Sequence, residues 1–528
     1  MEGDKEKLFR RVVCTPKTRV RILGEIMTWA NNTTSQSPSI YWLFGQAGSG
    51  KSTIAYTIAR RFEFARNADD VIVLGGNFFC SRQFEETRFA SRIIRTIVYH
   101  LALRCKAFAN ALNQYGNFES VEQNANAQLK DLLIEPWEKS APNRGADSSY
   151  LIVIDALDEI DGTGGSEFLR DLLDAIRKHR LLGLKFFVTS RSDQGLVTHV
   201  ESFKEKELCR LEEVPPEEAQ TDIATYLDTS LPRFKGSEVV VKLVKLAAGL
   251  FIYASTVVKY LASCEGPYQD AFLRKLFSIH NATDPQSSSA AAKAFDLLDG
   301  LYGQILSGVF QDIDRQDSEW DDHLSILHTF LSTAEPISTS ITAELLFSPE
   351  YTKVADTLLS RLHAVLYTKN GRVLSYHKSF SDFLFDKNRS GDWYCDLSIH
   401  QQRLTESCFR VMKGLKFNIA NIPSSFILDH DNLALQGEVE RNISPVLSYS
   451  CRTWDYHLAA TTSTTSSGLL NILEDFLHIR TLFWIEAMNL LGSSGRCVPM
   501  LQAACKWVLK STVSVILAEQ RPRNRLSC

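Results

Sequence analysis

The chain has 528 residues, of which 44% are hydrophobic and 23% are charged. These values exclude a disordered or fibrous chain, and the length predicts several domains, because one hydrophobic core stops growing at about 250–300 residues. The 58 basic and 62 acidic residues give a net charge of −4 and are spread along the sequence, so nucleic acid is not an expected partner.

The cysteines and the apolar segments predict a cytoplasmic protein with no membrane partner. Eleven cysteines are scattered without a Cys-x-x-Cys pair, which is typical of reduced thiols and not of a disulfide framework. The N-terminus, Met1 to Lys5, lacks the apolar core of a signal peptide. The run from Leu246 to Ala262 approaches the length of a membrane span, but Ser255 and Thr256 interrupt it, and we interpret it as a buried helix.

Between residues 39 and 210, short apolar runs alternate with helical patterns, which is typical of a parallel sheet covered by helices. After Leu211 helical periodicity dominates, and Pro215-Pro216-Glu217-Glu218 indicates a helix start. We therefore expect an α/β domain followed by a helical domain. The expected strands are residues 40–44, 71–79, 150–154, 184–189 and 207–211.

The first expected strand runs into Gly45-Gln46-Ala47-Gly48-Ser49-Gly50-Lys51-Ser52-Thr53, which fits the pattern G-x-x-x-x-G-K-[ST]. The glycines let backbone N–H groups turn inward around phosphate oxygens. Lys51 is expected to contact the β- and γ-phosphates, and Ser52 to bind Mg²⁺ through its hydroxyl. A helical pattern follows at residues 54–64, which completes the strand, loop and helix of an ATP or ADP site.

A second strand, residues 151–154, ends in Asp155, which we predict to coordinate the Mg²⁺ ion. Asp158 and Glu159 follow it and are candidates to orient or deprotonate an attacking water. Asp161 is interpreted as part of a solvated acidic turn.

A further buried strand ends at Arg191, which we predict to contact the γ-phosphate through charge-assisted hydrogen bonds. The alternative is a surface arginine that pairs with Asp193.

In the second half of the chain, residues 287–292 are small and polar and are predicted to be a linker. Asn370-Gly371 lies between two strand-like runs and predicts a hairpin. Helices followed by a hairpin suggest a winged helix. From residue 398 onward only helical patterns are found, interrupted at residues 422–424 and 461–468, and no repeat of fixed period is visible.

These motifs resemble the NACHT family of STAND NTPases, in particular fungal proteins related to incompatibility and innate-immunity receptors. Residues 155–159 resemble the family's extended Walker B motif, and residues 187–191 resemble its sensor strand. Residues 78–82 and 249–254 are also similar to fungal members. The resemblance implies that the chain switches conformation with bound nucleotide, hydrolyses ATP slowly and forms a homo-oligomer when activated, with unknown sensor and effector partners.

Residues 376–384 resemble the segment in which related receptors place a winged-helix histidine on the ADP β-phosphate. By that likeness His377 is a nucleotide-binding switch residue; the alternative is a polar cap after a strand. Three features depart from the family pattern. Lys17 stands where similar fungal chains tend to carry Gly, beside an adenine-binding lip expected near Thr18 and Arg19. Residues 249–251 lack the proline that contacts adenine in animal and plant relatives. The usual effector and repeat domains are missing, so the chain is expected to be a fragment or a reduced member.

The expected fold class is multidomain α/β plus α. Two other functions are weighed against the switch: a DNA-binding winged-helix ATPase regulator, and a metabolic kinase, for which no substrate domain is visible. The expected domains are a lead-in with the adenine lip at residues 1–38, a NACHT P-loop NTPase domain at 39–212, a helical domain and linker at 213–318, a winged-helix-like domain at 319–395 and a C-terminal helical region at 396–528.

Overall fold

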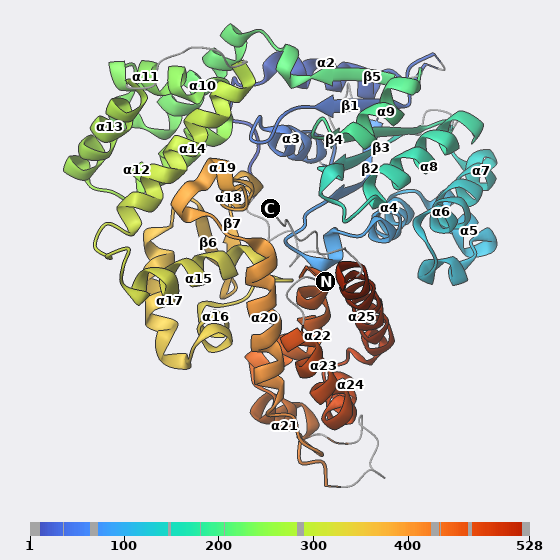
Figure 1. Cartoon of the computed structure of the whole chain (residues 1–528). Helices are drawn as coiled ribbons and strands as arrows, with labels where there is room; N and C mark the ends of the chain where they lie inside the picture. The colour runs from blue at the N-terminus through green and yellow to red at the C-terminus, as the bar shows by residue number, and fades with distance from the viewer. Residues whose placement is uncertain are drawn as a thin grey trace, which may run out of the picture. The chain divides into compact units, whose positions relative to one another are not determined.

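A computed structural model describes residues 11–519, except 35, 64–71, 146–148, 180, 205, 282–289, 424–431, 433 and 463–466. Figure 1 shows the elements coloured along the chain. The contacts divide the chain into two compact units. The first comprises Met1–Gln304 together with His377–Ser379, and the second comprises Ile305–Tyr376 and Phe380–Cys528.

The first unit contains a five-stranded sheet in the order β2-β3-β4-β1-β5, and all its strand pairs are parallel. All five expected strands are present, and their ends are shifted by at most about one residue. Residue 71, the expected first residue of the second strand, lies outside the described residues. Because the strands are parallel, the segments that follow β1, β3 and β4 emerge at one edge of the sheet. The strands are β1 (Ile40–Phe44), β2 (Ile72–Phe79), β3 (Ser149–Asp155), β4 (Leu184–Ser190) and β5 (Lys206–Arg210).

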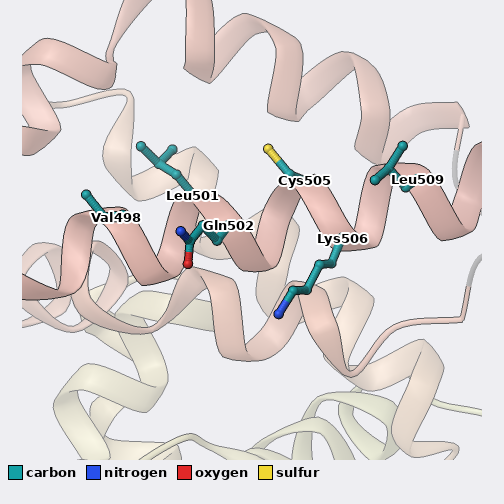
Figure 2. Close-up of a pocket in the computed structure, with 6 residues that line it drawn as sticks. All are labelled: Val498, Leu501, Gln502, Cys505, Lys506 and Leu509. Atoms are coloured by element: carbon teal, nitrogen blue, oxygen red, sulfur yellow. The ribbon is translucent and has the colours of Figure 1, made fainter. Parts of the chain in front are cut away.

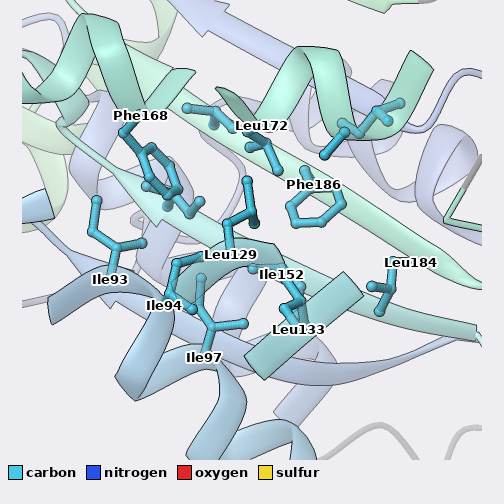
Figure 3. Packing of buried hydrophobic residues seen from close by; sticks show 14 of the residues in the cluster. Ile93, Ile94, Ile97, Leu129, Leu133, Ile152, Phe168, Leu172, Leu184 and Phe186 are labelled. Atoms are coloured by element: carbon cyan, nitrogen blue, oxygen red, sulfur yellow. The ribbon is translucent and has the colours of Figure 1, made fainter. Parts of the chain in front are cut away.

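Helices cover both faces of this sheet. Successive residues of a strand point to opposite faces, so an apolar strand needs a covering layer on each side. In β3, Ile152 and Ile154 belong to one buried cluster, whereas Leu151 and Val153 belong to the other. Figure 3 shows the first cluster, in which residues of α4 and α8 pack around Ile152. The helices of this part are α2 (Val20–Asn31), α3 (Lys51–Glu63), α4 (Ala90–Arg104), α5 (Lys106–Tyr115), α6 (Ala125–Gln128), α7 (Glu135–Ser140), α8 (Gly164–His179) and α9 (Gln194–Ser202).

A helical part follows the sheet, and its first helix begins at Pro216, as the sequence predicts. The apolar run from Leu246 to Ala262, expected to be one helix, is divided between two helices by Ala248 and Gly249, which have φ values of 46° and 85°. In the part of the chain that the structure describes, no helix is long and apolar enough to cross a membrane. The helices here are α10 (Pro216–Ser230), α11 (Glu238–Ala247), α12 (Phe251–Ala262), α13 (Gly266–Asn281) and α14 (Ala290–Val309).

The predicted linker at residues 287–292 is only partly described. Residues 287–289 lie outside the described residues, and residues 290–292 form the first turn of α14. The second half of this linker is therefore helical, because a run of alanines has the highest helix propensity of any residue type.

The second unit contains three helices and then the predicted hairpin, followed by further helices. Its two-residue turn has φ values of 51° at Asn370 and 74° at Gly371, which the Asn-Gly pair accepts readily. The predicted interruption at residues 422–424 lies between α20 and α21, with residue 424 outside the described residues. Of the second, at 461–468, residues 463–466 lie outside the described residues, and residues 467–468 already belong to α23. The elements are α15 (Ser318–Ser332), α16 (Thr339–Leu346), α17 (Thr352–Arg361), β6 (Leu366–Lys369), β7 (Arg372–Ser375), α18 (Lys378–Leu384), α19 (Lys387–Ser390), α20 (Leu397–Met412), α21 (Leu435–Asn442), α22 (Pro445–Ala459), α23 (Ser467–Ile479), α24 (Thr481–Leu490) and α25 (Cys497–Glu519).

A shallow apolar groove runs along α25 and is drawn in Figure 2. Lys506 is the one charged residue among those that line it. It contains none of the residues predicted to bind nucleotide, which belong to the first unit. The other lining residues are Val498, Leu501, Gln502, Cys505 and Leu509.

Candidate nucleotide-binding site

The loop between β1 and α3 has the backbone that the phosphate-binding motif requires. Gly48 and Gly50 have φ values of 78° and 95°, in the left-handed region that favours glycine. A Cβ atom on Gly48 would lie 2.1 Å from Cγ2 of Ile252, so a larger residue does not fit there. The backbone N–H of Ile252 in turn donates to the carbonyl of Gly48 at 3.1 Å, which joins the start of α12 to the loop.

Lys51, the first residue of α3, lies over this loop and is only 8% exposed. Its Nζ donates to the carbonyl oxygens of Gly45 at 2.6 Å and of Gln46 at 2.9 Å. Burial lowers the pKa of Lys51 to about 8, and the negative charge of Asp158 partly opposes that shift. The ammonium group is therefore held at the loop that the motif assigns to the phosphates.

This pKa predicts that ATP affinity falls at alkaline pH. Phosphate groups favour the ammonium form, so nucleotide binding raises the pKa of Lys51 above about 8 and takes up a proton when the pH exceeds that value. We expect the ATP dissociation constant to rise by up to about tenfold per pH unit above about pH 8. Calorimetric titrations at several pH values measure this slope, and a Lys51→Met variant should lose it. An equal slope in both proteins would assign the titration to another group.

Asp155 ends β3 with its side chain buried, at 2% exposure. The Thr189 hydroxyl donates to its Oδ1 at 2.6 Å. Burial raises the pKa of Asp155, and the hydrogen bond from Thr189 and the nearby Ser52 hydroxyl oppose the rise. The Ser52 hydroxyl thus lies near the Asp155 carboxylate, and such hard oxygen atoms are suitable ligands for Mg²⁺.

Thr189 was not predicted from the sequence as a site residue. Its Oγ1 accepts from the backbone N–H of Ala156 at 3.0 Å while it donates to Asp155. Ala156 has a φ of 54°, which turns the chain sharply at the end of β3. Thr189 thus fixes the direction of the Asp155 carboxylate.

Arg191 follows β4 and pairs with Asp158. Its backbone N–H donates to Oδ1 of Asp158 at 3.0 Å, and its Nε lies 3.3 Å from Oδ2. The alternative partner, Asp193, instead caps α9 by accepting from the N–H groups of Gly195 and Leu196. The structure thus brings Arg191 together with Asp158, and Asp158 positions Arg191.

Glu159 ends the short turn Leu157–Glu159 that follows β3. Burial raises its pKa, while the charges of Lys378 and Arg191 oppose the rise. The backbone N–H of Arg82 donates to Oε2 of Glu159 at 3.3 Å. A carboxylate with a raised pKa is a better proton acceptor than an ordinary carboxylate, which suits Glu159 to accept a proton from water. Arg82 was missed as a site residue, although its segment was noted as similar to fungal members.

His377 belongs by its contacts to the first unit, where its Cε1 lies 3.8 Å from the position of a Cβ on Gly48. The backbone N–H of Ser379 donates to Nδ1 of His377 at 3.1 Å, and the Ser379 hydroxyl lies 2.7 Å from the same nitrogen. An amide N–H can only donate, so Nδ1 carries no proton and the neutral ring carries its proton on Nε2. Burial, together with the charges of Arg191 and Lys51, lowers the pKa of His377 to about 3. His377 is therefore a neutral hydrogen-bond donor beside the loop.

The segment expected to form the adenine lip contacts the loop from another side. Arg19 donates from Nη2 to the carbonyl of Ser49 at 2.8 Å, and its guanidinium lies over the ring of Phe251. Thr18 is buried beside it. Lys17 has a φ of 72°, which accounts for the Gly that similar fungal chains carry at this position. The contact of these residues with adenine stays a prediction.

Comparisons with known proteins agree with the resemblance predicted from the motifs. Residues 22–191 match the family model described as Nephrocystin 3, N-terminal. The vegetative incompatibility protein HET-E-1 of Podospora anserina is 22% identical over 497 residues, which cover 86% of this chain and 33% of that protein. The chain is thus similar to a fungal incompatibility protein, as the motifs predict. It spans about a third of the length of that curated relative.

Two solved structures are also similar in part. A Signal Transduction ATPase with Numerous Domains from Pyrococcus horikoshii, which has a tetratricopeptide repeat sensor, matches with a TM-score of 0.38 and 13% identity, over 97% of this chain and 66% of that one. Cdc6p from Pyrobaculum aerophilum matches with a TM-score of 0.31 and 12% identity, over 76% of this chain and 97% of that one.

Proposed function

We propose that this chain binds ATP and ADP with Mg²⁺ at Gly45–Thr53 and uses the nucleotide as a conformational switch that slow hydrolysis resets. The observation that carries the proposal is the convergence of Lys51, Asp155 and His377 on the loop after β1. They come from three distant parts of the sequence. Each offers a different chemistry: a cation, a metal ligand and a neutral donor.

Each group has a distinct role in this proposal. The loop amides and Lys51 bind the phosphates, while Ser52 and Asp155 hold Mg²⁺, which when bound supplies positive charge to the phosphate oxygens. Arg191, oriented by Asp158, contacts the γ-phosphate. Glu159 accepts a proton from the attacking water.

His377 gives the switch its selectivity for ADP. Its Nε2–H donates to the β-phosphate in the closed state, because Nδ1 is already engaged by Ser379. The residues on either side of His377–Ser379 in the sequence belong to the second unit. A nucleotide contact at His377 is therefore covalently linked to that unit. ADP and ATP then shift the equilibrium between the closed and open conformations to different extents, because each nucleotide binds the two conformations with different affinities.

We predict that His377→Leu weakens ADP binding by about ten- to one hundredfold, because a hydrogen bond to a charged group contributes about 1.5–3 kcal/mol. ATP affinity should be unchanged, and larger assemblies should form without a trigger. Calorimetry and size-exclusion chromatography measure the two effects.

The control for this variant is His179→Leu, which removes an exposed histidine at the end of α8 that pairs with Glu138 of α7. Lys378, the neighbour of His377, is not a suitable control, because its charge lowers the pKa of Glu159. If His377→Leu binds ADP with the affinity of the parent and forms assemblies of the same size, His377 is an ordinary polar cap and does not contact the nucleotide.

The proposal as a whole is tested by the size of the purified chain with each nucleotide. We expect a monomer with ADP and a larger assembly with ATP and Mg²⁺. The same size in both conditions would contradict the switch.

We further propose a cytoplasmic location and no nucleic-acid partner, and a gel shift with duplex DNA tests the latter. A nucleotide-dependent shift would favour the winged-helix DNA regulator instead.

A further inference from the structure

Three buried metal-binding residue types meet in the second unit, apart from the nucleotide site. His328 lies on α15, Cys395 lies two residues before the start of α20, and His400 lies in the first turn of α20. One ligand atom of each lies within 4.8 Å of the others. Their exposed fractions are 7%, 1% and 7%.

The hydrogen bonds of His328 fix the position of its ring proton. Its Nε2 lies 3.1 Å from the carbonyl oxygen of Trp393, which can only accept. The proton of the neutral ring is therefore on Nε2, and Nδ1 keeps a lone pair.

The same deduction applies to His400. Its Nε2 lies 3.0 Å from Oγ1 of Thr329, and this hydroxyl uses its own hydrogen to donate to the carbonyl of Ser325 at 2.8 Å. Thr329 can therefore only accept from His400, so Nδ1 of His400 also keeps a lone pair. Histidines that ligate metals show this arrangement, in which one nitrogen donates to an oxygen and the other binds the ion.

A third buried histidine in the same unit provides the contrast. His457 on α22 uses both ring nitrogens, with Nδ1 2.5 Å from Oε1 of Gln401 and Nε2 2.7 Å from the hydroxyl of Tyr449. It is a core histidine satisfied by its neighbours. Among the residues that the structure describes, His328 and His400 have one such oxygen partner each.

We propose that His328, Cys395 and His400 bind a transition-metal ion, Zn²⁺ in particular, which joins α15 to the start of α20. Two imidazole nitrogens and a thiolate match the ligand preference of Zn²⁺, whereas Mg²⁺ and Ca²⁺ prefer oxygen. Binding releases the Cys395 thiol proton to solvent and forms bonds from Sγ and two nitrogens to the ion, without any change in oxidation state. The site is expected to stabilise the second unit, since the metal ties together elements far apart in the sequence.

The test uses the full chain, freed of metal and nucleotide and then titrated with Co²⁺ as a spectroscopic probe for Zn²⁺. We expect about one Co²⁺ per chain with thiolate-to-cobalt charge-transfer absorption. Zn²⁺ should displace this signal and raise the melting temperature. Absence of the band in the parent chain would overturn the proposal without the need for any variant.

Variants then identify the ligands. Cys395→Ser should abolish the charge-transfer band, whereas the matched control Cys408→Ser, which alters a buried free cysteine within α20, should keep it. Thr329→Val should lower Zn²⁺ affinity by about 10–100-fold, because it removes the acceptor that orients His400. A band that survives in Cys395→Ser, or is lost equally in Cys408→Ser, would contradict this ligand set.

Discussion

Lys51→Met should weaken the binding of both ATP and ADP by about one hundredfold or more. Lys51 is expected to contribute charge-assisted hydrogen bonds to two phosphate groups, each worth about 1.5–3 kcal/mol, and methionine keeps the length of the side chain but not the charge. Lys51 is buried and bonded to two loop carbonyls, so its replacement also affects the packing of the loop. A thermal melt must therefore accompany the binding measurement by calorimetry.

The matched control is Lys185→Met. Lys185 on β4 is also buried, at 6% exposure, and its Nζ donates to the Trp29 carbonyl at 2.6 Å and to the Ser37 hydroxyl at 2.7 Å. Burial lowers its pKa to about 8, as for Lys51. Both variants should lose stability, but only Lys51→Met should lose nucleotide affinity. Equal losses of affinity in the two variants would contradict the role of the loop.

Glu159→Gln should lower the rate of ATP hydrolysis by about 10²–10⁴-fold while ATP still binds, because glutamine cannot accept the proton of the attacking water. Burial raises the pKa of Glu159, so the ionised base is lost as the pH falls through that raised value. The hydrolysis rate of the parent should consequently rise with pH on the acidic side. Single-turnover phosphate release at saturating ATP measures both effects.

The control is Asp161→Asn in the same acidic turn. Asp161 pairs with Arg88 at 3.3 Å and its backbone N–H donates to the Arg88 carbonyl at 2.9 Å, as befits a structural residue. Its replacement should leave hydrolysis almost unchanged. Asp158→Asn should instead loosen Arg191 and lower the rate through the γ-phosphate contact. An ATP hydrolysis rate in Glu159→Gln equal to that of the parent would show that another residue accepts the proton of the attacking water.

The strands and the phosphate loop could be predicted because their signals are local. Four apolar residues that end in Asp155, and a glycine-rich loop between a strand and a helix, each lie within about ten residues of sequence. The parallel sheet then brings the strand ends to one edge without any further information. The Asn370-Gly371 hairpin is likewise determined by two residues that accept positive φ.

The partners of these groups could not be predicted, because they depend on contacts between distant segments. Thr189 lies 34 positions from Asp155, whose carboxylate accepts from its hydroxyl. Arg19 reaches Ser49 across 30 positions, and His328 and His400 meet only through the packing of α15 and α20. Hydrophobic periodicity contains no information about such pairs.

The nucleotide that copurifies with the full chain tests the central proposal most directly. Heat release followed by chromatography should recover close to one ADP per chain from the parent and almost none from Lys51→Met, since the closed state is held by the loop and His377. Recovery of no nucleotide from the parent, or of equal amounts from both proteins, would contradict the assignment of Gly45–Thr53 as the site of a nucleotide-operated switch.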